Sequence, residues 1–155
     1  MLTLRRLRIL GGKPLDLMRK RLTSGLEIEA TGEPIRRGDD VEALVTISDP
    51  AKVGSVEVGV VCTEYYDEDV EQTSTDSHGV PQTQSSRETL EATAHEEWRP
   101  LEPVAGVQSA RFAIPADAPF TYEGDCLTFQ WEVVARGRRR DRLDALASTP
   151  ISVTP

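Results

Sequence analysis

Two histidines are the side chains best suited to chemistry in this sequence, and neither has the partners that catalysis requires. His78 and His95 both lie in an acidic, turn-rich stretch, and Ser77 stands directly beside His78. A Ser-His-Asp triad is assembled from separate elements, so adjacent residues do not indicate one. His78 with Asp76, or His95 with Glu91, supplies two metal ligands, whereas a zinc site needs three or four at defined spacing. We therefore expect no catalytic residue, no metal, no cofactor and no enzymatic activity.

One acidic run and two basic runs are the remaining candidates for binding. Asp67–Glu71 lacks the glycine and the terminal glutamate of an EF-hand loop, so it indicates a solvated strand edge or a docking site for a basic partner. Arginine side chains fit carboxylate or phosphate groups, although residues 136–142 are also typical of a solubilising turn. The predicted partner-binding residues, all basic, are Arg5, Arg6, Arg8, Arg19, Lys20, Arg21, Arg136, Arg138, Arg139 and Arg140.

The net charge of −8 conceals a strong asymmetry along the chain. Residues 1–22 carry seven basic side chains against Asp16, whereas residues 67–97 carry nine acids against Arg87. Because an acidic body repels phosphate, we expect no nucleic-acid partner.

The sequence also predicts the compartment. It contains no apolar run approaching the ~18 residues of a membrane helix, and arginines interrupt the first leucines, so neither a span nor a secretory signal is expected. Cys62 and Cys126 are too few for a disulfide framework and are expected to stay reduced in a cytoplasm, with Cys62 buried.

From Leu26 onward the apolar residues recur with period two, which predicts strands. Gly38, within Arg37–Asp39, is suited to a turn between the first two strands. A helix competes with the strand over residues 86–97, because Leu90 and Trp98 also fall near one helical face. The predicted strands cover residues 26–31, 40–48, 53–66, 87–98, 109–114, 126–135 and 146–153. The second half of 53–66 is expected to project into a hairpin with a polar tip, and Trp131 is expected to lie in the core.

About seven strands without βαβ alternation predict an all-β, immunoglobulin-like antiparallel β-sandwich. Six phrases follow one another within residues 25–155, namely Arg37–Val41, Val53–Val58, Phe112–Pro119 (F-A-I-P-A-D-A-P), Tyr122–Gly124, Leu127–Ala135 and Pro150–Val153. In this combination the chain resembles the arrestin-like β-sandwich superfamily, and within it bacterial members similar to sporulation-control proteins. Many members carry two such sandwiches, and only one fits here. The resemblance implies an adaptor or scaffold role and supplies no site residue, since the family has no common active site.

The predicted organisation is a basic amphipathic N-terminal arm, residues 1–24, followed by an arrestin-like β-sandwich domain, residues 25–155. Within the first segment Leu15, Met18 and Leu22 share a helical face after Pro14. That segment either completes the sandwich as a strand and connector or docks on an acidic protein groove or anionic lipid. The expected function is a cytoplasmic, non-enzymatic protein-interaction module, acting as an adaptor, a scaffold or a subunit of a larger assembly. The alternative is a peripheral binder of membranes or other anionic surfaces.

Overall fold

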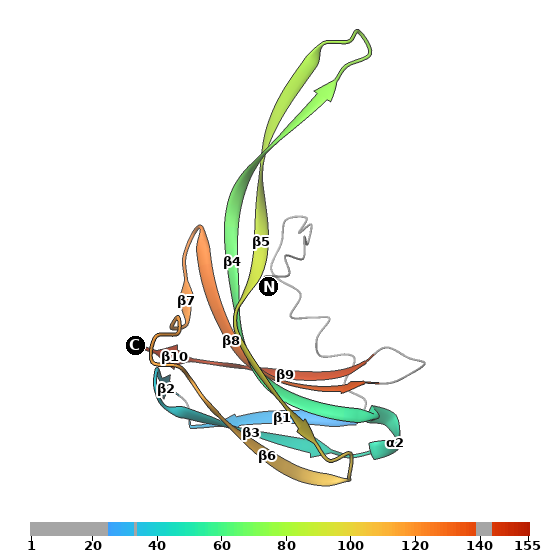
Figure 1. Cartoon of the computed structure of the whole chain (residues 1–155), viewed down its shortest axis with the longest axis vertical. Coiled ribbons are helices and arrows are strands. Elements are labelled where there is room, and N and C mark those ends of the chain that lie inside the picture. The colour runs from blue at the N-terminus through green and yellow to red at the C-terminus, as the bar shows by residue number, and fades with distance from the viewer. Residues whose placement is uncertain (1–24, 33, 139–143) are drawn as a thin grey trace.

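Strands dominate the part of the chain that the computed structural model describes, which is residues 25–32, 34–138 and 144–155. This confirms the all-β prediction. The elements follow in the order β1 (Leu26–Thr31), β2 (Ile35–Arg36), β3 (Asp40–Ile47), α2 (Pro50–Val53), β4 (Ser55–Thr75), β5 (Pro81–Leu101), β6 (Gly106–Ala113), β7 (Tyr122–Glu123), β8 (Leu127–Arg138), β9 (Ala145–Ile151) and β10 (Val153–Thr154) (Figure 1).

Two antiparallel sheets face each other across the core. The smaller sheet has the order β1-β3-β6, and the larger has the order β5-β4-β8-β7, with β9 paired to β8. A short parallel pair, β2 with β10, lies at one end of the sandwich. In Figure 1 the smaller sheet covers only the lower part of the larger one. The upper part of the larger sheet therefore continues beyond the sandwich.

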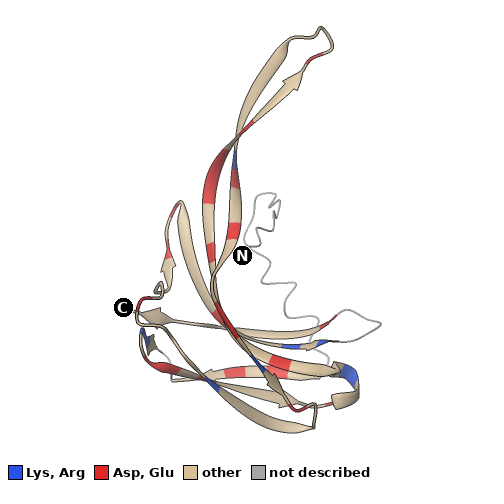
Figure 2. Cartoon of the chain, viewed as in Figure 1, with Lys and Arg blue, Asp and Glu red and all other residues tan. Residues whose placement is uncertain are grey.

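This continuation ends in a two-stranded hairpin, residues 67–89, which we call the hairpin arm. The ladder between β4 and β8 ends at Tyr66, and from Asp67↔Thr89 to Thr75↔Pro81 the described part of β4 pairs with β5 alone. Residues 67–75 span about 30 Å at the usual rise of a strand. Figure 2 places most acids of the hairpin arm near the sandwich. The predicted hairpin with a polar tip is confirmed, but its projecting part begins at Asp67, beyond the predicted strand 53–66, because β8 still flanks β4 up to Tyr66.

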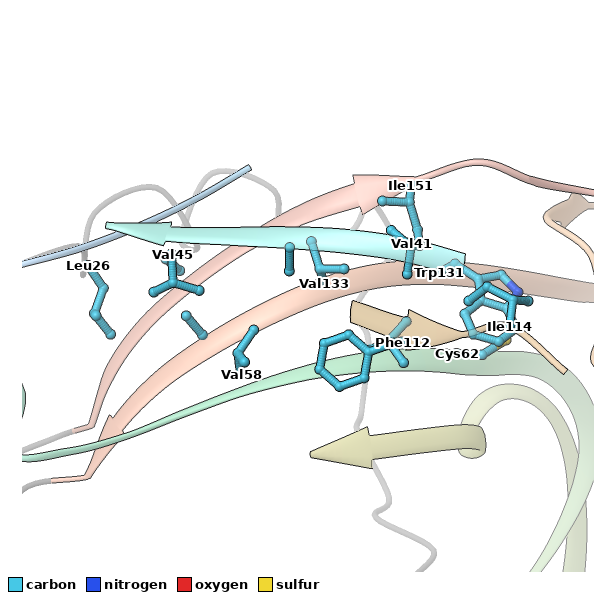
Figure 3. Packing of buried hydrophobic residues seen from close by; sticks show 14 of the residues in the cluster. Leu26, Val41, Val45, Val58, Cys62, Phe112, Ile114, Trp131, Val133 and Ile151 are labelled. Carbon is cyan, nitrogen blue, oxygen red and sulfur yellow. The ribbon is translucent and has the colours of Figure 1, made fainter. Parts of the chain in front are cut away.

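The core consists of aliphatic side chains from both sheets together with the rings of Phe112 and Trp131 (Figure 3). Val45 of β3 lies on the face of its sheet that packs against the larger sheet, and Val58 of β4 lies on the face that packs against the smaller sheet. Both side chains are fully buried. Trp131 is 1% exposed, and its indole N–H donates to the carbonyl oxygen of Pro119 at 2.9 Å. The prediction that Trp131 is a core residue is therefore confirmed.

The phrase Phe112–Pro119 closes one end of this core. Ile114 is buried and exchanges backbone hydrogen bonds with the predicted turn: Gly38 N–H donates to Ile114 O at 2.8 Å, and Ile114 N–H donates to Asp39 O at 2.9 Å. Gly38 has φ +91°, which glycine adopts without the steric cost of a side chain. Two of the phrases that carry the family resemblance are thus in direct contact.

The segment before β4 differs from the prediction. Val53, where the predicted strand begins, is instead the last residue of the short helix α2. This helix forms because the Asp49 carboxylate accepts from Ala51 N–H at 3.1 Å and Pro50 suits the first helical turn. The competing helix over residues 86–97 does not form, since this segment pairs with β4 along its length.

The arginine-rich turn also begins later than predicted. Arg136 to Arg138 belong to β8, where Gly137 lies directly against the backbone of Val53 and a Cβ atom would collide with it. The single last strand predicted over 146–153 is divided into β9 and β10, of which β10 leaves the larger sheet to pair with β2.

Candidate functional site

The hairpin arm carries a cluster of exposed charge. Its acids number six against a single arginine, giving a net charge of −5; they are Asp67, Glu68, Asp69, Glu71, Asp76 and Glu88, with Arg87 as the cation. Successive side chains of a strand alternate between faces, so Asp67, Asp69 and Glu71 share one face. The arm therefore presents a row of carboxylates at every second residue.

Only part of this charge is neutralised within the described chain. Thr89 Oγ1 donates to Asp67 Oδ1 at 2.7 Å, and the guanidinium of Arg87 lies 3.6 Å from Asp69 Oδ1. The second contact joins side chains that are 62% and 76% exposed, so solvent screens it strongly. On the opposite face Glu68 lies directly across from Glu88, and like charges in such a pair destabilise a hairpin.

The tip of the hairpin arm is fixed by local hydrogen bonds. The Asp76 carboxylate accepts from His78 N–H and from Val80 N–H, both at 2.9 Å, and Gly79 has φ +80°. Ser77 Oγ lies 3.3 Å from His78 Nδ1 at the exposed tip. These contacts define a turn, as predicted for this segment.

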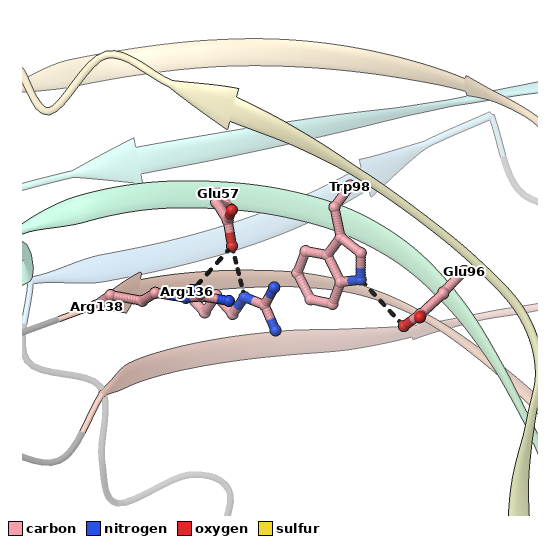
Figure 4. Close-up of polar contacts among 5 residues, drawn as sticks. All are labelled: Glu57, Glu96, Trp98, Arg136 and Arg138. Atoms are coloured by element: carbon pink, nitrogen blue, oxygen red, sulfur yellow. Dashed lines mark hydrogen bonds and ion pairs between the residues drawn. The ribbon is translucent and has the colours of Figure 1, made fainter. Parts of the chain in front are cut away.

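A second cluster lies on the outer face of the larger sheet (Figure 4). Trp98 of β5 lies over Gly59 of β4, where an added Cβ would come within 2.5 Å of the indole. The guanidinium of Arg136 stacks 3.9 Å from the centre of the Trp98 ring. Arg136 Nε also donates to Glu57 Oε2 at 2.8 Å, and Arg138 Nε lies 3.7 Å from the same oxygen. Glu57, Trp98 and Arg136 thus join three neighbouring strands.

The predicted partner-binding residues divide into two groups. Arg136 and Arg138 are placed by the structure, and both contact Glu57, so a part of their charge is neutralised by the protein itself. The others lie outside the described residues and are Arg5, Arg6, Arg8, Arg19, Lys20, Arg21, Arg139 and Arg140.

His95 is partly buried beside the core, whereas His78 is exposed at the tip of the hairpin arm. Its ring is tilted against Trp131 with 5.6 Å between ring centres, and its Nε2 atom is buried without a hydrogen-bond partner. Nearby on the same face of β5, Arg99 forms an ion pair with Glu97 at 2.8 Å and lies 4.9 Å from the centre of the Phe112 ring. His95 is therefore a packed side chain at the margin of the core.

The two cysteines differ in environment. Cys62 is buried and Cys126 is exposed, and neither forms a disulfide. Burial, reinforced by the negative charge of Glu64, raises the pKa of the Cys62 thiol to about 12. The predicted burial of Cys62 is confirmed. Within the described residues no three His, Cys, Asp or Glu side chains form a group that could hold a metal ion.

Sequence reasoning missed two features of these surfaces. The contact between Trp98 and Arg136 depends on the register of three strands, which periodicity alone does not give. Phe120 and Tyr122 form an edge-to-face pair, 6.3 Å between ring centres, and both are more than one-third exposed. Their position directly after the phrase Phe112–Pro119 was the available signal.

No protein-family model matches the chain, and no curated protein matches it. In the described residues no helix is long and apolar enough to cross a membrane. Among solved structures, the chain is similar in fold to Spo0M, the sporulation control protein from Bacillus subtilis, with 12% identity, a TM-score of 0.42, and coverage of 85% of this chain and 50% of that one. It is also similar to a DUF4466 family protein from Parabacteroides merdae, with 14% identity, a TM-score of 0.36, and coverage of 84% and 46%. The chain spans about half the length of both structures.

Proposed function

We propose that this chain is a non-enzymatic protein-interaction module, a cytoplasmic adaptor or scaffold, that binds a basic surface of another protein with its hairpin arm. The observation that carries the proposal is the net charge of −5 on an element that projects from the sandwich and pairs with no described strand outside itself.

The arm contributes little to folding, which favours a role in binding. Isolated two-stranded hairpins are marginally stable in water, and each ordered residue costs about 1–2 kcal/mol of backbone entropy. The aliphatic residues of the hairpin arm are Val70 and Val80, and Val80 is 54% exposed. Burial therefore compensates for little of the ordering cost.

Charge gives the arm a preferred kind of partner. A row of carboxylates accelerates encounter with a basic surface and selects against acidic ones, an effect that decreases with salt. A lysine or arginine side chain of the partner that lies between Glu68 and Glu88 would relieve the repulsion of these two carboxylates through charge-assisted hydrogen bonds.

The proposal is tested by shortening the arm. Tyr66 and Leu90 are directly opposed, so an Asn-Gly turn in place of residues 67–89 joins them without changing the register of the sandwich. We expect this variant to fold. In a pull-down from cell extract, the full chain should retain its partner protein and this variant should not. Binding of the purified partner should also weaken for Glu68→Gln/Glu71→Gln. The matched control is Glu27→Gln/Glu29→Gln, which removes two exposed charges from β1. Equal binding by the full and shortened chains contradicts the proposal.

An alternative function rests on the basic residues of the first segment. Residues 1–22 carry a net charge of +6, and each basic side chain near an anionic bilayer contributes about 1 kcal/mol. On this alternative the full chain sediments with vesicles that contain anionic lipid and not with zwitterionic vesicles, whereas residues 25–155 alone remain in the supernatant. Shortening the hairpin arm would leave sedimentation unchanged, which distinguishes the two functions.

A further inference from the structure

The outer edge of β5 carries no further strand within the part of the chain that the structure describes. β5 pairs with β4 on one side, and no other described strand pairs with it. An unpaired edge presents backbone N–H and C=O groups that can pair with a strand of another chain, and proteins usually protect it with charges, prolines or bulges. Residues 82–86 of β5, Gln-Thr-Gln-Ser-Ser, contain no charge and no proline. This edge is therefore suited to receive a further strand.

The opposite edge of the hairpin arm is unsuited to self-association. Four of the five residues in Asp67–Glu71 are acidic, so two copies of this segment side by side would repel each other. The charges of β5 over the same part of the arm are mixed, because Arg87 is followed by Glu88 and Glu91. The charges therefore favour the β5 edge over the β4 edge for pairing between two copies.

We propose that two copies of this chain associate through their β5 edges, antiparallel and with the two-fold axis at Thr89. In an antiparallel pair related by such an axis, residues of one face oppose residues of the same face. Arg87 of one copy then faces Glu91 of the second copy, and the reciprocal pair forms on the other side of the axis. Both residues lie on the face that carries Asp69 and Tyr65, their partners in β4.

The alternative registers are disfavoured by their charges. An axis at Arg87, Glu88 or Glu91 brings that side chain against its own copy, and like charges in direct opposition destabilise strand pairing. An axis at Ser85 or Ser86 pairs uncharged residues and forms no opposite-charge pair. Of these registers, the one with its axis at Thr89 is the one that forms two ion pairs. Its strand pairing extends over residues 85–93 of both copies, up to the bulge of β5.

This association joins the larger sheets of two copies into one continuous sheet. It leaves the acidic edge of β4 unpaired, so both hairpin arms remain open to a partner. The variant that lacks residues 67–89 also lacks Arg87 and Thr89, so it should lose the dimer as well as the partner. Glu68→Gln/Glu71→Gln leaves the β5 edge intact, and it therefore distinguishes failure of the proposed function from failure of the dimer.

A charge exchange tests the register. Arg87→Glu and Glu91→Arg each replace two attractive pairs with two repulsive ones, so each should raise the dimer dissociation constant by about tenfold to a hundredfold. The double variant restores opposite charges and should return the dimer. Arg87→Glu also places a carboxylate directly opposite Asp69 within the monomer, and because both side chains are exposed this repulsion is screened by solvent. Sedimentation velocity gives the constants, and circular dichroism confirms that each variant is folded.

Disulfide trapping tests the axis by a different route. In a Cys126→Ser background, Thr89→Cys brings two thiols into direct opposition, at a Cα separation that permits a disulfide. Thr83→Cys is the matched control, because Thr83 lies on the same strand and the same face, yet two copies of it would be about 40 Å apart. We expect rapid cross-linking through position 89 and none through position 83. The proposal is overturned if the chain stays monomeric, if the double exchange does not restore the dimer, or if both cysteines cross-link equally.

Discussion

Replacing Trp131 with alanine tests whether the faces of β8 are assigned correctly. Trp131 is 1% exposed, so the substitution removes an aromatic side chain that buries about 200 Å² and leaves a cavity between the sheets. It also removes the hydrogen bond to Pro119 O and leaves that carbonyl without its indole donor. The expected loss in the free energy of unfolding is about 3–5 kcal/mol.

Urea denaturation followed by circular dichroism measures this loss, and for a chain of this length it corresponds to a decrease in Tm of roughly 10 °C. Trp98→Ala is the matched control because it makes the same chemical change on the outer face. Trp98 is only half-buried and contacts Gly59 and Arg136, so the expected cost is about 1–2 kcal/mol. If Trp131→Ala costs no more than Trp98→Ala, the core is not where the structure places it.

Three further predictions concern single residues. In the folded chain Cys126 should react with a thiol reagent at once and Cys62 only after denaturation, and equal labelling of both thiols would argue against burial of Cys62. Because the pKa of Cys62 is raised from 9.0 to about 12 in the folded chain, the free energy of unfolding should also decline as pH rises through that interval. Gly137→Ala should lower the free energy of unfolding by about 2–4 kcal/mol because the new methyl group meets the Val53 backbone, and an unchanged urea midpoint would show that β8 ends earlier. His95→Leu should raise it by about 0.5–1.5 kcal/mol because a buried nitrogen without a partner is removed, and a destabilised variant would indicate that Nε2 is hydrogen-bonded in solution.

The strands that could be predicted from the sequence are those that bury one face. β1, β3 and β8 alternate apolar and polar residues because one side of each packs on the core, and this alternation is visible without knowledge of the partner strand. The hairpin arm was only partly predicted because residues beyond Tyr66 contact no core and carry no periodic signal. The two-residue strands β2, β7 and β10 are too short to produce a pattern.

The candidate sites were less accessible to prediction because they depend on register. Arg136 was assigned to a polar turn, yet its position opposite Glu57 and near Trp98 makes it a strand residue that joins its neighbours. The charge asymmetry was evident, since the acids of residues 67–97 are close in sequence. Their arrangement in a projecting hairpin, with Glu68 facing Glu88, required the pairing of β4 with β5.

Site-specific photo-cross-linking in cells shows whether the hairpin arm is the element that contacts a partner protein. A photoreactive amino acid at Gln72 or at Gln84 samples the two strands of the arm, and the same amino acid at Glu29 samples the exposed surface of β1. We expect a covalent adduct with one basic protein from both arm positions and none from position 29. An adduct that forms from position 29 alone, or no adduct from either arm position, would contradict this expectation.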